Sequence, residues 1–154
     1  MMNLSFSLPD VDSAWRGTWK VAQQKNPSEL TEIDLRYKYF SANVEMIVDG
    51  VEVISSRSFV TLVDLALSLL DAERCISSGE DTAVGFTERA EVIHLRHSEG
   101  NIVVTSSEQS WRVVVDREEL RSSISEFLRE VHSCLTSEVP GLSSHPTIRQ
   151  MQQI

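Results

Sequence analysis

Histidine is the side chain that most readily moves a proton or binds a metal at neutral pH, and the chain has four. His94 and His97 lie in a segment whose alternation predicts a strand, where their spacing places them on opposite faces. His132 has no histidine or carboxylate four residues away on its predicted helix, and His145 precedes Pro146. Because no spacing matches a zinc-binding helical pair, we expect neither a metal site nor a bound cofactor.

The remaining polar residues give equally little indication of a catalytic nucleophile. Cys75 and Cys134 fall in apolar helical patterns, which predicts reduced core residues rather than reactive thiols or disulfides. No Gly-x-Ser-x-Gly elbow is present, and the six glycines form no phosphate-binding turn. We therefore expect no enzymatic activity. The alternative is a small hydrolase with dispersed residues, for which the candidates are His94, Asp64 and Glu91.

The net charge of −9, from 14 basic and 23 acidic residues, disfavours binding to nucleic acids and to anionic membranes. It suits solubility alone or a basic protein partner. The most apolar stretch, 62–70, is too short to cross a bilayer, and residues 1–10 lack a signal-peptide pattern. We expect a cytoplasmic protein that binds neither nucleic acid nor membrane.

The elements that would carry these side chains follow from the periodicity of apolar residues. Val11, Trp15, Trp19 and Ala22 predict an N-terminal helix, which docks on the core or, alternatively, faces a partner. Alternation predicts strands at 32–40, 44–48, 51–54, 83–87, 91–97, 101–106 and 111–115, with tight turns at Asp49-Gly50 and Glu99-Gly100. Helical spacing predicts helices at 59–76 and from about 116 to 139, the second opened by a capping box at 116–119.

This order predicts a single α+β domain over residues 1–154. We expect one antiparallel sheet of about six or seven strands with the two main helices on one face. Residues 1–31 would form an N-terminal helical extension. Residues 140–154 would form a C-terminal tail, in which a short helix near 146–153 is possible.

The predicted first hairpin presents apolar side chains among charges on its outward side, as protein interfaces do. Its outward positions are Asp34, Arg36, Lys38, Phe40, Glu45, Ile47 and Asp49. The alternative is that a helix covers this side as well. Acidic residues there and elsewhere would speed the encounter with a basic partner. The predicted partner-binding residues are Phe40, Glu45, Ile47, Asp49, Glu52, Glu80 and Asp81.

Three stretches carry a resemblance to a known group of proteins. They are DLRYKYFSANVEMIVDG at 34–50, FVTLVDLALSLL at 59–70 and DREELRSSISEFLREV at 116–131. They look like a group of small bacterial proteins that are similar in layout to the immunity proteins of polymorphic toxin systems. The resemblance implies a cytoplasmic inhibitor that occludes the active site of a toxin, and it transfers no functional residue. The alternatives are a hydrolase that reverses a toxin's modification, or a regulatory or scaffolding subunit that forms a homodimer.

Overall fold

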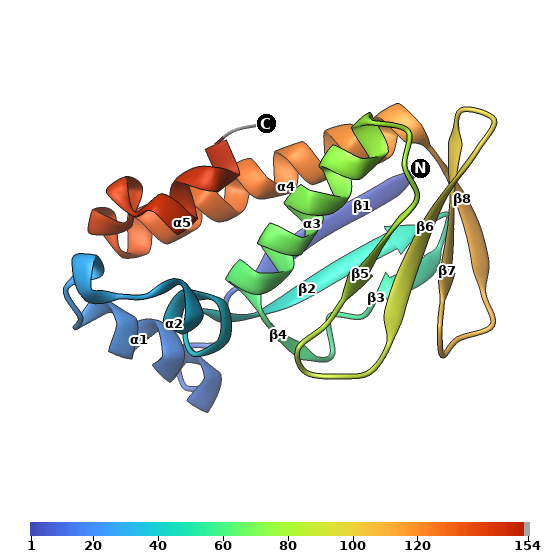
Figure 1. Cartoon of the computed structure of the whole chain (residues 1–154). Coiled ribbons are helices and arrows are strands. Elements are labelled where there is room, and N and C mark those ends of the chain that lie inside the picture. The colour runs from blue at the N-terminus through green and yellow to red at the C-terminus, as the bar shows by residue number, and fades with distance from the viewer. Residues whose placement is uncertain (153–154) are drawn as a thin grey trace.

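Two antiparallel sheets and two long helices make up most of the protein in the computed structural model, which describes residues 1–152 (Figure 1). Sheet A contains β1 (Met2–Ser7), β2 (Ser41–Val48), β3 (Val51–Ile54) and β4 (Phe59–Thr61). Sheet B is a meander of β5 (Thr82–Gly85), β6 (Val92–Ser98), β7 (Asn101–Ser106) and β8 (Arg112–Asp116). The long helices are α3 (Leu62–Ser77) and α4 (Arg117–Glu138).

Shorter helices complete both ends of the chain. The first group is η1 (Ala14–Arg16), α1 (Gly17–Gln23), η2 (Pro27–Glu29) and α2 (Glu32–Tyr37), and the second is η3 (Pro140–Ser144), α5 (Pro146–Arg149) and η4 (Gln150–Gln152). The expected C-terminal tail thus contains a short helix, and its residues 153 and 154 lie outside the described part. None of the helices within residues 1–152 combines the length and apolarity that crossing a membrane requires.

The α+β class and the antiparallel pairing are confirmed, but the prediction of one sheet is wrong. Strand β2 is the centre of sheet A: it pairs with β1 along one edge and with β3 and β4 along the other. Helix α3 then separates these strands from the meander β5–β8, which forms its own sheet. The sequence pattern identifies most of the strands of both sheets but does not specify which strands pair across a helix.

The prediction of a strand at 32–40 is also wrong, because these residues form helix α2. Thr31 and Asp34 make a reciprocal capping box: the Asp34 amide donates to Thr31 Oγ1 at 3.1 Å, and the Thr31 amide donates to Asp34 Oδ2 at 3.3 Å. The apolar residues of the alternating pattern do not share one buried face, since Leu35 is buried whereas Ile33 is 70% exposed. The capping interactions therefore outweigh the β-branched and aromatic composition of this segment.

Residues 1–31 were predicted to form a helical extension, but they are only partly helical. It begins with β1, whose Met2, Leu4 and Phe6 face the core and whose register with β2 runs from Met2↔Val48 to Ser7↔Asn43. The following α1 docks on the core through Trp19, which is fully buried. Trp19 Nε1 donates to the Ser41 carbonyl at 2.7 Å, so this helix is fixed to the start of β2.

Both predicted tight turns are present. Asp49 and Gly50 have φ values of 48° and 81°, and Glu99 and Gly100 have 49° and 84°. Two consecutive left-handed residues give the turn that matches the twist of a two-residue hairpin, and glycine adopts this conformation without strain. These turns set the register of β2 with β3 and of β6 with β7.

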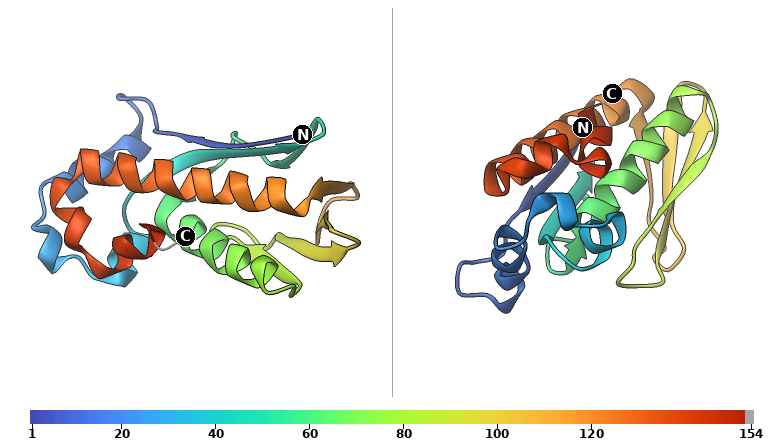
Figure 2. Two further views of the ribbon diagram at one scale, coloured as in Figure 1. Left: turned by 90° about the horizontal axis from the view of Figure 1, so that it is seen from above. Right: turned by 60° about the vertical axis from the view of Figure 1, so that its left-hand side comes forward.

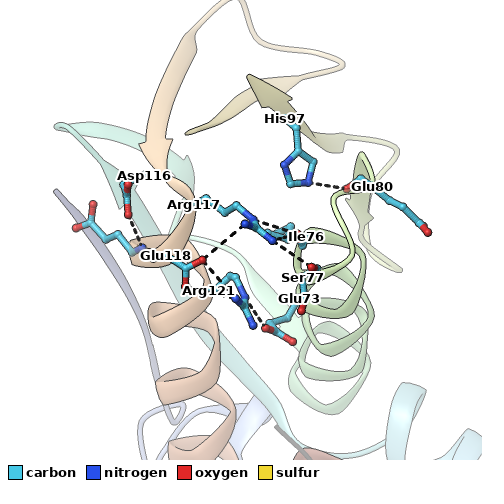
Figure 3. A network of polar contacts seen from close by, with 10 residues as sticks. Glu73, Ile76, Ser77, Glu80, His97, Asp116, Arg117, Glu118 and Arg121 are labelled. Carbon is cyan, nitrogen blue, oxygen red and sulfur yellow. Dashed lines mark hydrogen bonds and ion pairs between the residues drawn. The ribbon is translucent and has the colours of Figure 1, made fainter. Parts of the chain in front are cut away.

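Arginines of α4 tie it to the end of α3 (Figure 3). The Arg117 guanidinium donates to the Ile76 carbonyl and, at 3.1 Å, to the Ser77 carbonyl, both in the last turn of α3. One turn further, Arg121 Nε donates to Glu73 Oε1 at 3.0 Å, and this hydrogen bond raises the pKa of Arg121. These contacts hold the C-terminal end of α3 against the N-terminal end of α4.

The capping box expected at 116–119 is only half present. The Asp116 carboxylate accepts from the Glu119 amide at 3.0 Å, as predicted. The Glu119 carboxylate does not return to its own helix end, and instead accepts from the Met2 amide at 3.2 Å. Helix α4 thereby contacts the beginning of β1, and Phe127 packs edge-on against Phe6 further along.

Candidate functional site

The surface with the clearest features for recognition is the outer face of sheet A. Its members are Asn3, Ser5 and Ser7 of β1, Asn43, Glu45 and Ile47 of β2, Glu52 of β3 and Phe59 of β4. Directly paired residues of antiparallel strands project to the same side, so the register places these side chains on one face. Helices α3 and α4 both lie on the opposite side of β1 and β2 (Figure 2, left).

Burial along β2 shows the same division between the two faces. Ala42, Val44, Met46 and Val48 are buried against the helices, whereas the alternate residues Asn43, Glu45 and Ile47 are half-buried. One face is therefore part of the core and the other is accessible. The alternative considered from sequence, that a helix also covers the outward side of this hairpin, does not hold for the long helices.

A stacked aromatic pair lies at one end of the outer face of sheet A. The rings of Trp15 and Phe59 are 5.0 Å apart between centroids and inclined by 26°. Trp15 is held in place because the Ser13 side chain caps the short helix η1 and because Thr18 Oγ1 donates to the Trp15 carbonyl. Trp15 nevertheless remains 49% exposed. One side of its indole therefore faces solvent while the other packs on Phe59.

Acidic and apolar side chains occupy the centre of the same face. Ile47 lies between Asn3 on β1 and Glu52 on β3, and Glu45 precedes it by one step on the same side. Glu52 forms a long, exposed ion pair with Arg57 at 3.5 Å. Glu45 has no ion-pair partner within residues 1–152. A basic partner would therefore find at least one uncompensated carboxylate here.

Asp49 lies at the far end, in the β2–β3 turn. Its carboxylate accepts from the ammonium group of Met1 at 2.9 Å, and this hydrogen bond raises the pKa of that ammonium. Four of the seven residues predicted to bind a partner, Glu45, Ile47, Asp49 and Glu52, thus belong to one continuous strand-turn-strand unit. Trp15 and Phe59 were not among the predicted residues, although the tryptophan pattern of the N-terminal helix had raised the possibility of a partner-facing side.

The expectation that Phe40 faces outward is wrong, because its side chain is fully buried. Phe40 follows α2 rather than ending a strand, and its backbone adopts the left-handed conformation with a φ of 63°. Its ring packs edge-on against Trp19 at 4.9 Å between centroids. The chain reversal at Phe40 turns this side chain inward, which alternation could not indicate.

Glu80 and Asp81 lie apart from the outer face of sheet A, in the connection between α3 and β5. Asp81 Oδ1 accepts from the His97 amide at 2.8 Å, which extends the pairing of β5 with β6. The Glu80 carbonyl contacts His97 Nε2 at 3.0 Å, and Figure 3 shows the Glu80 side chain pointing away from this histidine. Both residues remain exposed, but they do not form one patch with Glu45 and Glu52.

The three residues considered for hydrolysis have separate surroundings. Asp64 accepts from Arg36 Nη2 at 2.7 Å and from Thr87 Oγ1 at 2.8 Å. Burial lowers the pKa of Arg36, but the hydrogen bond and charge of Asp64 outweigh that effect and raise it overall. Glu91 is held by Ser106 and by Arg89, and His94 forms no hydrogen bond with either carboxylate within the described residues. These contacts explain both carboxylates as structural ion pairs.

The outer face of sheet B carries two arginines and one aspartate, Asp116. The pairing of β6, β7 and β8 places Arg96 beside Val103, Val103 beside Val114, and Thr105 between His94 and Arg112. Both arginines are exposed, and Val114 is 38% exposed. A basic partner would thus be attracted less to the outer face of sheet B than to the outer face of sheet A.

No group of three or more histidine, cysteine or acidic side chains within residues 1–152 is placed to hold a metal ion. Comparison of the chain with protein-family models, with curated proteins and with solved structures finds no match.

Proposed function

We propose that the protein is an immunity protein, which binds a basic bacterial toxin in the cytoplasm and blocks the toxin's active site with the outer face of sheet A. The observation that carries this proposal is the half-exposed aromatic stack of Trp15 on Phe59 at the end of an uncovered, acidic sheet face.

Interfaces gain most of their affinity from a few aromatic anchors, and acidic residues around them steer a basic partner. Trp15 supplies a rigid anchor because Phe59 supports its ring. Glu45 supplies an uncompensated negative charge on β2, and Glu52, whose ion pair with Arg57 is long and exposed, lies near it on β3. The net charge of −9 acts in the same direction at long range.

The proposal is tested with the product of any neighbouring toxin-like reading frame. Co-expression of this protein should restore the growth of bacteria that express the toxin. The purified pair should bind, and Trp15→Ala should weaken binding by about tenfold to a hundredfold, as loss of an interface anchor does. Glu45→Lys should mainly slow association and reduce its dependence on salt.

The matched control is on the outer face of sheet B, where Val114→Ala also removes an exposed apolar side chain. This variant should bind and protect as well as the original protein. Failure of the original protein to protect the bacteria would rule out the proposed function. If the Trp15→Ala and Glu45→Lys variants protect as well as the original protein, the assignment of binding to this face is ruled out.

A further inference from the structure

Strand β1 forms a free edge of sheet A. It pairs with β2 on one side, and within residues 1–152 its other side pairs with no strand. The Asp49 amide donates to the Met1 carbonyl at 3.0 Å, which makes these two a hydrogen-bonded pair. Pairs alternate along an antiparallel ladder, so the amides and carbonyls of Met2, Leu4 and Phe6 point away from β2. The contact from the Met2 amide to Glu119 agrees with this assignment.

This edge lacks the features that normally prevent a further strand from adding. Edge strands are usually protected by proline, by charged residues or by a bulge. The sequence of β1, MNLSFS, contains neither proline nor a charged residue, and its register with β2 is uninterrupted. The backbone groups of Leu4 and Phe6 make no hydrogen bond to another element among the described residues. They are therefore available to a partner.

A groove of about 210 Å³ runs along this edge between β1 and α4. Met2, Asn3, Leu4 and Ser5 form one wall, and Ser123, Glu126 and Glu130 form the other. The two elements lie side by side in both Figure 1 and Figure 2. Glu126 and Glu130 are exposed and make no ion pair within residues 1–152.

We propose that this groove binds an extended segment of a partner protein, which adds as a strand to β1 and places lysine or arginine side chains against Glu126 and Glu130. Backbone hydrogen bonds to Leu4 and Phe6 would supply affinity, and the acidic helix would select for basic side chains. A second copy of β1 fits poorly, because MNLSFS carries no basic residue and two copies of the acidic wall would repel each other. The inference does not depend on the partner being a toxin.

The test uses a synthetic nine-residue peptide that alternates lysine with valine and threonine, and a matched peptide with glutamate in place of lysine. The lysine peptide should bind, with slowed hydrogen exchange at the amides of Leu4 and Phe6, and the glutamate peptide should not. Glu126→Lys combined with Glu130→Lys should weaken binding by about tenfold or more. Glu29→Lys combined with Glu108→Lys makes the same change in net charge on other exposed elements and should leave binding unchanged.

The backbone contribution is separated from side-chain packing by two variants at one position. Leu4→Pro removes the outward amide, and Leu4→Ala removes the same leucine side chain while keeping that amide. Binding should be lost in the first variant and retained in the second, with both checked for folding by circular dichroism. The inference is overturned by absence of binding, by binding that Glu126→Lys and Glu130→Lys leave unchanged, by protection outside β1, or by dimers that form through β1.

Discussion

The indole of Trp15 lies stacked on the ring of Phe59, with centroids 5.0 Å apart, and the pairing of β4 with β2 places Phe59 beside Asn43. Trp19, one turn later, is fully buried and donates to the Ser41 carbonyl. The two tryptophans therefore have different roles. Trp15→Ala should lower the free energy of unfolding by about 0.5–1.5 kcal/mol, and Trp19→Ala by about 3–5 kcal/mol. Urea denaturation measures both, and equal losses would contradict this distinction.

The ion pair between Arg36 and Asp64 is part-buried and is reinforced by Thr87. Asp64→Asn should therefore lower the free energy of unfolding by about 1–3 kcal/mol, because a part-buried guanidinium loses its charged partner. The exposed pair of Arg57 with Glu52 is the control, and Glu52→Gln should change stability by less than about 0.5 kcal/mol. A loss for Glu52→Gln as large as that for Asp64→Asn would contradict this ranking.

The thiol of Cys134 is half-buried in α4, and burial raises its pKa, with the nearby charge of Glu138 adding to the effect. A raised thiol pKa leaves less thiolate at any given pH, and the thiolate is the form that reacts. In a Cys75→Ser variant, iodoacetamide should modify folded Cys134 at least about tenfold more slowly than in urea at the same pH. Mass spectrometry follows the modification, and equal rates in the two conditions would refute the prediction.

Gly141 is the second residue of η3, which follows α4, and it lies directly against Pro27 of η2. A Cβ atom at this position would be 2.5 Å from Pro27 Cγ. Gly141→Ala should lower the free energy of unfolding by about 1–3 kcal/mol, as overpacking does. Gly17 has helical backbone angles and open space around it, so Gly17→Ala should raise stability by up to about 1 kcal/mol. Thermal melts of the two variants should shift in opposite directions.

Sequence reasoning worked best where local chemistry dictates structure. The turn at Asp49-Gly50, the hairpin of β6 and β7, and the apolar side of α4 were all predicted and are confirmed. It failed at 32–37, although Thr31 and Asp34 have the spacing of a capping box and provided the signal for a helix. It also missed β1, whose Met2, Leu4 and Phe6 alternate with polar residues.

Sequence analysis predicted only those residues of the candidate site that lie in the hairpin of β2 and β3. The spacing of Glu45 and Ile47 places them on one side of β2, and the turn brings Glu52 beside Ile47. The contact of Trp15 with Phe59 required knowledge that β4 pairs with β2, which no local pattern encodes. The burial of Phe40 likewise depends on a chain reversal set by tertiary contacts with Trp19.

The contact of Phe6 with Phe127 joins the beginning of the chain to its last long helix, and this has a consequence for biosynthesis. On the ribosome, β1 and β2 emerge before α4, because their residues precede 117–138 in the sequence. The part of β1 that α4 covers must therefore stay uncovered until residues 117–138 have been synthesised. Completion of the native state should await release of α4, and a nascent chain stalled before that helix should be recognised by chaperones that bind exposed apolar segments.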